Sequence, residues 1–263
     1  FLRSSFGITA RRTALDAGEC FDKTPARNAA LARLSTEWIL VVDADERISP
    51  DALGDVAKRL PDSPWAGYFC PWITHRVGDR LEDYKLALFR RGFTARGRVH
   101  ENMQTDLRAR GARAAWCADL VIDHHPDAQR RDVKREWYRQ RLDCAIRKDP
   151  GWIRYHWFRG YIAHREGDAA MAEAMLNIAA ASRSGQFPVE CLNAHLVLAE
   201  RHAGRDDRDG TARILAAAAD FLSTVAEDCE VRINFRLPPW IRHAMDAARE
   251  GRLDEVRSYE FAC

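Results

Sequence analysis

One stretch, residues 38–46, constrains the fold of this chain more than any other. Its sequence is WILVVDADE, five apolar residues followed by three acids within four positions. A short apolar run without polar alternation predicts a strand buried on both faces, as in a parallel sheet. In open α/β sheets, ligands bind just outside the carboxyl ends of the strands, where these acids fall. Clustered carboxylates repel one another unless a cation compensates, so the stretch predicts a metal site that faces a phosphate-bearing ligand.

The composition narrows the class of protein. The chain has 263 residues, 46% hydrophobic and 30% charged, enough for one or two domains with a sizeable core. Its formal net charge of +2 gives no global electrostatic case for binding nucleic acid or a membrane. No apolar run approaches the roughly 20 residues of a transmembrane segment, and the start lacks the apolar core of a signal peptide.

The cysteines bear on the compartment. There are seven, an odd number, and none forms a Cys-x-x-Cys pair. They predict reduced thiols rather than a disulfide framework or a zinc site. The expected location is therefore cytoplasmic, with a peripheral position at the inner face of the membrane as a variant.

Cap and proline signals divide the first half of the chain into alternating elements. Thr24 with Pro25, and Ser49 with Pro50, have the side chains that favour a helix start. Residues 91–102 contain two glycines and predict a loop. The expected helices are 25–34 and 52–60, and the expected strands are 38–43, 66–75, 84–90 and 120–122.

Helical periodicity alone continues from residue 128. The segments 152–181, 192–221 and 240–261 each predict a helix, a glycine-containing turn and a second helix. Their spacing is near the roughly 34-residue tetratricopeptide period but does not match it. The aromatic residues between 152 and 161 have helical spacing, which favours core packing over a sugar-stacking platform. We therefore expect an α/β domain over residues 1–127 and a degenerate helical-repeat domain over 128–263.

Several motifs, in the same order, resemble glycosyltransferase family 2. Asp43-Ala44-Asp45 resembles the Asp-x-Asp motif of GT-A-fold enzymes, and residues 25–31 resemble the Arg-Asn-x-Ala helix that precedes it in the family. The segment 85–101 resembles the "Leu-Phe-Arg … Gly-x-Val-His-Glu" signature of a bacterial subgroup that includes lipopolysaccharide-core glucosyltransferase relatives. Ile122-Asp123-His124 resembles the Ile-x-His that closes the catalytic domain. The resemblance covers about residues 20–126 and, more loosely, the tetratricopeptide-like helices found in some members of the subgroup.

This resemblance implies a fold and an activity. The fold would be a GT-A-like, Rossmann-like mixed sheet, partly truncated, followed by an all-α tetratricopeptide-like domain. The activity would be metal-dependent, inverting transfer of a sugar from a nucleotide-sugar donor, such as a UDP-sugar, to a saccharide, lipid or peptide acceptor. The helical repeats would offer a surface for a protein partner or for self-association.

The resemblance also assigns roles to six residues. Asp45, Asp43 and His124 would hold Mn²⁺ or Mg²⁺, which stabilises the departing nucleoside diphosphate. Asp43 would alternatively face the ribose, and Arg27 would lie beside the diphosphate. Glu101 is the expected base for the acceptor hydroxyl, with His100 as the second candidate. Each has an ordinary alternative: solvated turn acids, a structural loop pair, a surface histidine, or an arginine on a solvated helix face.

One departure from the family pattern leaves other functions open. Family members begin with a strand, an acidic nucleoside-pocket residue and a second strand, and nothing in residues 1–23 resembles that opening. The chain would then be truncated, completed by another copy, or degenerate, and a missing strand would expose a sheet edge. The first alternative function is therefore a non-catalytic scaffold that binds a protein partner through its helices, with a relic transferase domain. A metal-dependent hydrolase that uses the same acids and histidines is the second.

Overall fold

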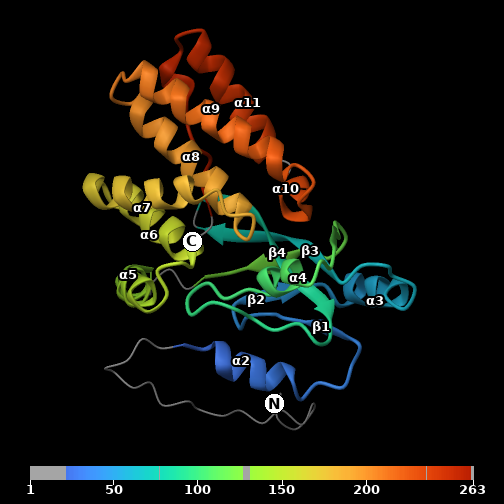
Figure 1. Cartoon of the computed structure of the whole chain (residues 1–263). Helices are drawn as coiled ribbons and strands as arrows, with labels where there is room; N and C mark the ends of the chain where they lie inside the picture. Colours follow the sequence, from blue (N-terminus) through green and yellow to red (C-terminus); the bar gives the residue numbers. More distant parts are fainter. Residues whose placement is uncertain (1–21, 77, 127–130, 235, 262–263) are drawn as a thin grey trace.

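The described part of the chain contains one mixed sheet followed by a series of packed helices. The computed structural model describes residues 22–76, 78–126, 131–234 and 236–261, with only the backbone of 131–135. The sheet has the order β1-β4-β3-β6-β2, with β5 also paired to β3. In Figure 1 the later helices stand above this sheet, and the first described helix lies below it. The strands are β1 (Trp38–Leu40), β2 (Glu46–Ile48), β3 (Gly67–Arg76), β4 (Asp79–Arg90), β5 (Ala114–Trp116) and β6 (Ile122–His124).

The strand that starts the acidic stretch is shorter than expected and is not parallel to its neighbour. The expected strand 38–43 forms only over Trp38–Leu40, and β1 pairs antiparallel with β4. Parallel pairing occurs instead where β3 meets β5 and β6. The run is apolar because its residues pack on two sides: Ile39 belongs to one cluster with Leu31 and Phe89, while Trp38 and Leu40 pack against a second cluster around Val56.

Within the described residues, three helices accompany the sheet. They are α2 (Thr24–Leu31), α3 (Pro50–Arg59) and α4 (Gln104–Ala109). The predicted cap of α3 is confirmed, since Oγ of Ser49 accepts from the Ala52 amide at 3.3 Å. The predicted cap of α2 is wrong, because Thr24 lies inside the helix and its amide donates to Asp22 at 2.9 Å. The sequence also gave no sign of α4, β2 or β5, which are all short.

The second half is helical, as expected. Successive helices from α6 to α9 pack on one another, and α11 packs on α9. Two of the three expected helix–turn–helix units form, α6 with α7 and α8 with α9. The third is wrong, because only the 3₁₀ turn η2 (Leu253–Glu255) follows the last helix. The helices are α5 (Arg131–Lys148), α6 (Ile153–Glu166), α7 (Ala169–Ser182), α8 (Pro188–Ala203), α9 (Arg208–Val225), α10 (Cys229–Ile233) and α11 (Leu237–Arg249).

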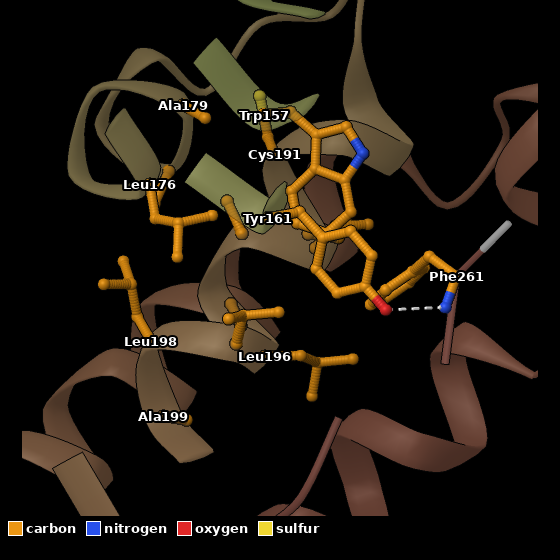
Figure 2. Packing of buried hydrophobic residues seen from close by; sticks show 14 of the residues in the cluster. Trp157, Tyr161, Leu176, Ala179, Cys191, Leu196, Leu198, Ala199 and Phe261 are labelled. Carbon is orange, nitrogen blue, oxygen red and sulfur yellow. Dashed lines mark hydrogen bonds between the residues drawn. The ribbon is translucent and has the colours of Figure 1, made fainter. Parts of the chain in front are cut away.

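Aromatic and aliphatic side chains fill the helical core. Trp157 and Tyr161 of α6 are each 3% exposed, which confirms core packing for these aromatics. Figure 2 shows Phe261 of the C-terminal segment beside both rings, where its amide donates to Oη of Tyr161 at 3.1 Å. The C-terminal segment thus packs back against α6.

The structure bears on two sequence predictions, reduced cysteines and the lack of a transmembrane segment. Cys70, Cys117, Cys191 and Cys229 are free thiols. Cys144 is disulfide-bonded, so the prediction of reduced cysteines is wrong at that position. None of the helices in the described ranges combines the length and apolar character needed to cross a bilayer.

Candidate active site

A cavity of about 400 Å³ lies between the sheet and the helices. Side chains from both halves of the chain line it, including residues of α2, β3, β4, α5, α6, α8 and the C-terminal segment. The site residues expected from the sequence all reach its wall, although they come from four separate stretches of chain. They are Arg27, Asp43, Asp45, His100, Glu101 and His124.

Asp45 and His124 meet because the short strands β2 and β6 pair antiparallel. Glu46 is opposite His124 in this register, and the His125 amide donates to the Asp45 carbonyl at 2.8 Å. As a result, Nε2 of His124 lies 3.4 Å from Oδ2 of Asp45. The other ring nitrogen, Nδ1, lies 3.0 Å from the hydroxyl of Thr74, and the ring stacks on Trp72. These contacts fix the ring and direct Nε2 toward the carboxylate.

Glu46, which the sequence reasoning did not single out, organises the acidic turn. Its side chain is 1% exposed, and it accepts from the Asp43 amide and from Nε1 of Trp72, each at 2.8 Å. Nζ of Lys85 lies 2.7 Å from the same carboxylate. Its position as the third acid of the run was the available signal, but no pattern distinguished a buried structural acid from a ligand.

Asp43 faces cations and not the Asp45–His124 pair. One of its oxygens accepts from Lys85 at 3.0 Å, and the other lies 3.6 Å from Arg27. Partial burial raises the pKa of Asp43, but the Lys85 ammonium and the Arg27 guanidinium outweigh it and hold the pKa below its ordinary value. Asp43 therefore stays ionised at neutral pH.

Glu101 is the most enclosed of the expected residues. Its side chain is 2% exposed, and Oε1 lies 2.8 Å from Nζ of Lys23 and 3.1 Å from Nη2 of Arg27. Neither carboxylate oxygen has a hydrogen bond of good geometry within the described part of the chain. Arg98, three residues before Glu101, pairs with Asp22 at 3.3 Å.

Asn28, which follows Arg27 in the Arg-Asn motif, holds the next loop. Its side chain donates to the Ala95 carbonyl at 3.0 Å and accepts from the Ala95 amide at 2.8 Å. This paired contact joins α2 to the segment that leads to Glu101. The motif therefore has a structural reason in this chain: the arginine faces the cavity and the asparagine fixes the loop beside it.

The helical half holds the loop that carries Glu101. Val99 is 1% exposed and belongs to the helical core, and the Arg98 amide donates to Oη of Tyr155 at 2.6 Å. His100 has a positive φ of 51° and stacks between Phe158 and Tyr138. The Gly-x-Val-His-Glu motif thus forms a contact between the two halves. Val99 and His100 contact the helical half, whereas the side chains of Arg98 and Glu101 pair with charged residues.

The protein side chains at this site fit a divalent cation that would be coordinated partly by the protein and partly by a phosphate. No three His, Cys, Asp or Glu side chains come together as a metal site within the described residues. Asp45 and His124 offer one carboxylate and one imidazole nitrogen at a half-exposed position, and Thr74 supports the ring from behind. Mg²⁺ is commonly held by one or two carboxylates together with substrate phosphates and water. The pair fits that pattern, whereas a complete protein cage is not present.

The helical wall of the cavity was not predicted. It carries buried polar side chains that belong to no recognisable motif and that approach the sheet only through the packing of α6, α8 and α10. These are Arg154, Glu190, Asn193, Glu230, Asn234 and Arg236, together with the rings of Trp157, Tyr259 and Phe261.

Comparison with known families adds an independent observation. No curated protein matches the chain. Residues 18–118 match the family described as "Glycosyl transferase family 2". This segment contains Arg27, the acidic stretch and the loop with Glu101, and it ends before His124. The match supports a glycosyltransferase domain of family 2, with the GT-A fold, in the first half of the chain.

Proposed function

We propose that the chain transfers a sugar from a nucleotide-sugar donor to an acceptor hydroxyl, with a divalent cation and with inversion at the anomeric carbon. The observation that carries the proposal is the 3.4 Å approach of His124 to Asp45 in a cavity where three of the lining cations act on Asp43. Those cations, Lys23, Arg27 and Lys85, suit a diphosphate. A carboxylate–imidazole pair beside them suits the metal that accompanies a diphosphate.

The donor end is assigned to the acidic turn and its cations. Asp45 and His124 would hold Mn²⁺ or Mg²⁺, and Asp43 would serve as a third ligand or face the ribose. A bound cation would supply Lewis-acid stabilisation of the diphosphate leaving group. Arg27 would bind the diphosphate and would then leave its ion pair with Glu101.

The acceptor end is assigned to Glu101. When a diphosphate competes for Arg27, the Glu101 carboxylate keeps fewer cationic partners and becomes a better hydrogen-bond acceptor. The acceptor hydroxyl would attack the anomeric carbon and pass its proton to Glu101, while the bond to the diphosphate breaks and its electron pair leaves with the diphosphate. His100, held between two rings, is the second candidate for the base.

Turnover of UDP-sugars with Mn²⁺ tests the donor assignment. Asp45→Ala should lower the rate by about 100- to 1,000-fold, as removal of one preorganised electrostatic group does. Asp119→Ala is the matched control, because Asp119 is an exposed acid paired with Arg59 on the surface. Equal rates for wild type and Asp45→Ala would remove Asp45 from the mechanism.

Calorimetry with UDP and Mn²⁺ separates this function from that of a scaffold. A transferase should bind UDP in a metal-dependent manner, and Glu101→Gln should keep this binding while it loses transfer. A scaffold with a relic domain should give no metal-dependent heat. Release of phosphate from model esters without an acceptor would indicate the hydrolase instead.

A further inference from the structure

The cavity continues beyond the proposed donor site into the helical half, where its wall is polar although it is buried. Glu190 and Asn193 of α8 are each 5% exposed, and Arg154 of α6 lies beside them. Buried polar side chains cost free energy unless they are bonded or used by a ligand. Their concentration on one wall of a cavity therefore requires an explanation.

Part of this polar wall joins the two halves of the protein. Arg108 of α4 bonds Asp228 at 2.8 Å and Glu230 at 3.0 Å, and Asn234 donates to Oη of Tyr84 at 3.2 Å. Their partners lie across the boundary between sheet and helices. These residues are explained as a structural bridge and need no ligand.

Three other polar side chains of the wall have their hydrogen-bond and ion-pair partners, among the described residues, within the helical half. Arg154 pairs with Glu190, and Oδ1 of Asn193 accepts from Tyr259 at 2.9 Å. Nε of Arg154 is buried and has no hydrogen-bond partner in the part of the chain that the structure describes. We call Arg154, Glu190 and Asn193 the helical polar wall. It presents a guanidinium, a carboxylate and an amide to the cavity.

The helical polar wall is connected to the proposed base through one stack of side chains. His100, next to Glu101, stacks on Phe158 with ring centroids 3.7 Å apart. The Arg154 guanidinium lies 5.2 Å from the centre of the same ring, one helical turn earlier on α6. His100, Phe158 and Arg154 therefore form one continuous line of contacts, and a molecule on the helical polar wall would share the cavity with Glu101.

The charges on this wall do not favour an anion. Arg154 is already paired with Glu190, and Glu230 lies close enough to Glu190 for that carboxylate to help raise its pKa to about 7, together with burial. A phosphate or carboxylate placed here would meet the Glu190 carboxylate and an arginine whose charge Glu190 already offsets. Planar polar groups backed by aromatic rings suit the vicinal hydroxyls of an uncharged sugar.

We propose that Arg154, Glu190 and Asn193 bind the acceptor, and that the acceptor is an uncharged saccharide. This inference rests on the proposed transferase function. The saccharide counts as an acceptor because it would present its hydroxyl to Glu101, the proposed base. It selects one of the three acceptor classes left open by the sequence, because the Arg154–Glu190 pair is already neutralised and offers hydrogen bonds to uncharged hydroxyls rather than a free charge.

Binding of small sugars to the whole chain tests the inference without a donor. The probes are the methyl glycosides of glucose, galactose and N-acetylglucosamine, together with lactose and glucose 6-phosphate, titrated at millimolar concentration by saturation-transfer NMR. Neutral sugars should bind, and glucose 6-phosphate should bind more weakly than methyl glucoside. Asn193→Ala should weaken binding by about tenfold or more, as the loss of one ligand hydrogen bond does.

Controls separate a ligand contact from a folding defect. Glu190→Gln keeps the shape of the side chain and should weaken sugar binding without a large change in melting temperature. Asn177→Ala is the matched control, because Asn177 is exposed on α7 and does not line the cavity. Equal sugar affinity in Asn193→Ala, Glu190→Gln and wild type would overturn the inference. Tighter binding of glucose 6-phosphate, or no binding of any neutral sugar, would also overturn it.

A failure here is distinguishable from a failure of the transferase assignment. The same samples are titrated with UDP and Mn²⁺, and Asp45→Ala should lose that binding while it keeps the sugar signal. Sugar binding without metal-dependent UDP binding would support the acceptor wall and contradict the donor site. Metal-dependent UDP binding, together with unaltered sugar binding in both wall variants, would support the donor site and contradict the acceptor wall.

Discussion

The imidazole of His100 lies flat against the ring of Phe158, with their planes 14° apart. The two residues belong to different halves of the protein, one to the loop between β4 and α4 and the other to α6. Since Glu101 follows His100 directly, this stack ties the position of the proposed base to the helical core. The helices therefore have a role in the site itself, and they are more than an appended repeat.

Phe158→Leu should lower kcat markedly while it lowers the stability of the protein only modestly. The substitution removes the stack on His100, worth about 0.5–1.5 kcal/mol, and releases the loop that carries Glu101. Because a displacement of about 1 Å can cost roughly 100-fold in rate, we expect kcat to fall by at least about tenfold. Phe221→Leu is the control, since Phe221 is equally buried on α9 but does not line the cavity. A kcat equal to that of the control would show that the stack does not position the base.

Gly97→Ala should destabilise the junction between sheet and helices. Gly97 has a φ of +92°, and a Cβ there would lie 3.1 Å from Nε1 of Trp152. The left-handed backbone alone costs an L-residue about 1–2 kcal/mol. Gly54→Ala provides the contrast, because Gly54 is in α3 with no atom within 4 Å of the added Cβ, so it should gain up to about 1 kcal/mol. Urea unfolding measures both, and a stabilised Gly97→Ala would contradict the argument.

Arg108→Ala should destabilise the protein far more than loss of a surface ion pair. Arg108 pairs with Asp228 and Glu230 and donates to the Gln186 carbonyl at 2.7 Å, so its removal leaves the Asp228 carboxylate without its paired arginine and Glu230 without one of its hydrogen-bond donors. Breaking such a buried arrangement costs about 3–5 kcal/mol. Arg59→Ala removes an exposed pair with Asp119 and should cost at most about 1 kcal/mol. Similar unfolding midpoints for the two variants would refute the distinction.

Glu230 should make the protein less stable as pH rises. Burial, and then the Glu190 carboxylate, raise the pKa of Glu230 from 4.5 to about 7 in the folded state. The folded state therefore holds a proton that the unfolded state releases above pH 4.5, and the stability linked to it is lost as pH rises toward about 7. Glu230→Gln should flatten the dependence of the urea midpoint across this interval. Glu227→Gln, at a side chain that is 93% exposed, should leave it unchanged.

Local signals in the sequence predicted much of the α/β half. The helix start at Ser49 and Pro50, the two long strands β3 and β4, and the acids after the first apolar run all rest on neighbours within a few residues. The expected site residues lie on one cavity because they occupy motifs whose order matches a known family. Sequence alone could not give the pairing of β1 with β4, because an apolar run packed on both faces has the same pattern in a parallel and an antiparallel sheet.

Contacts between distant segments could not be predicted. In the sequence, Glu46 looks like the acids beside it. Its buried structural role depends on the register of β2 against β6 and on the approach of Lys85. Arg154, Glu190 and Asn193 appear in the sequence as ordinary helix residues. Their polarity becomes informative only when α6 and α8 turn them toward the sheet, and that orientation depends on the whole helical core.

The return of the C-terminal segment to the cavity has a consequence for biosynthesis. Tyr259 and Phe261 line the cavity, and Glu260 pairs with Arg76 of β3 at 2.7 Å. A ribosome extends the chain from its N-terminus, so the acidic turn and its histidine emerge long before these residues do. The pocket is therefore completed only after position 261 leaves the exit tunnel, and before that point a nascent chain carries an unfinished pocket.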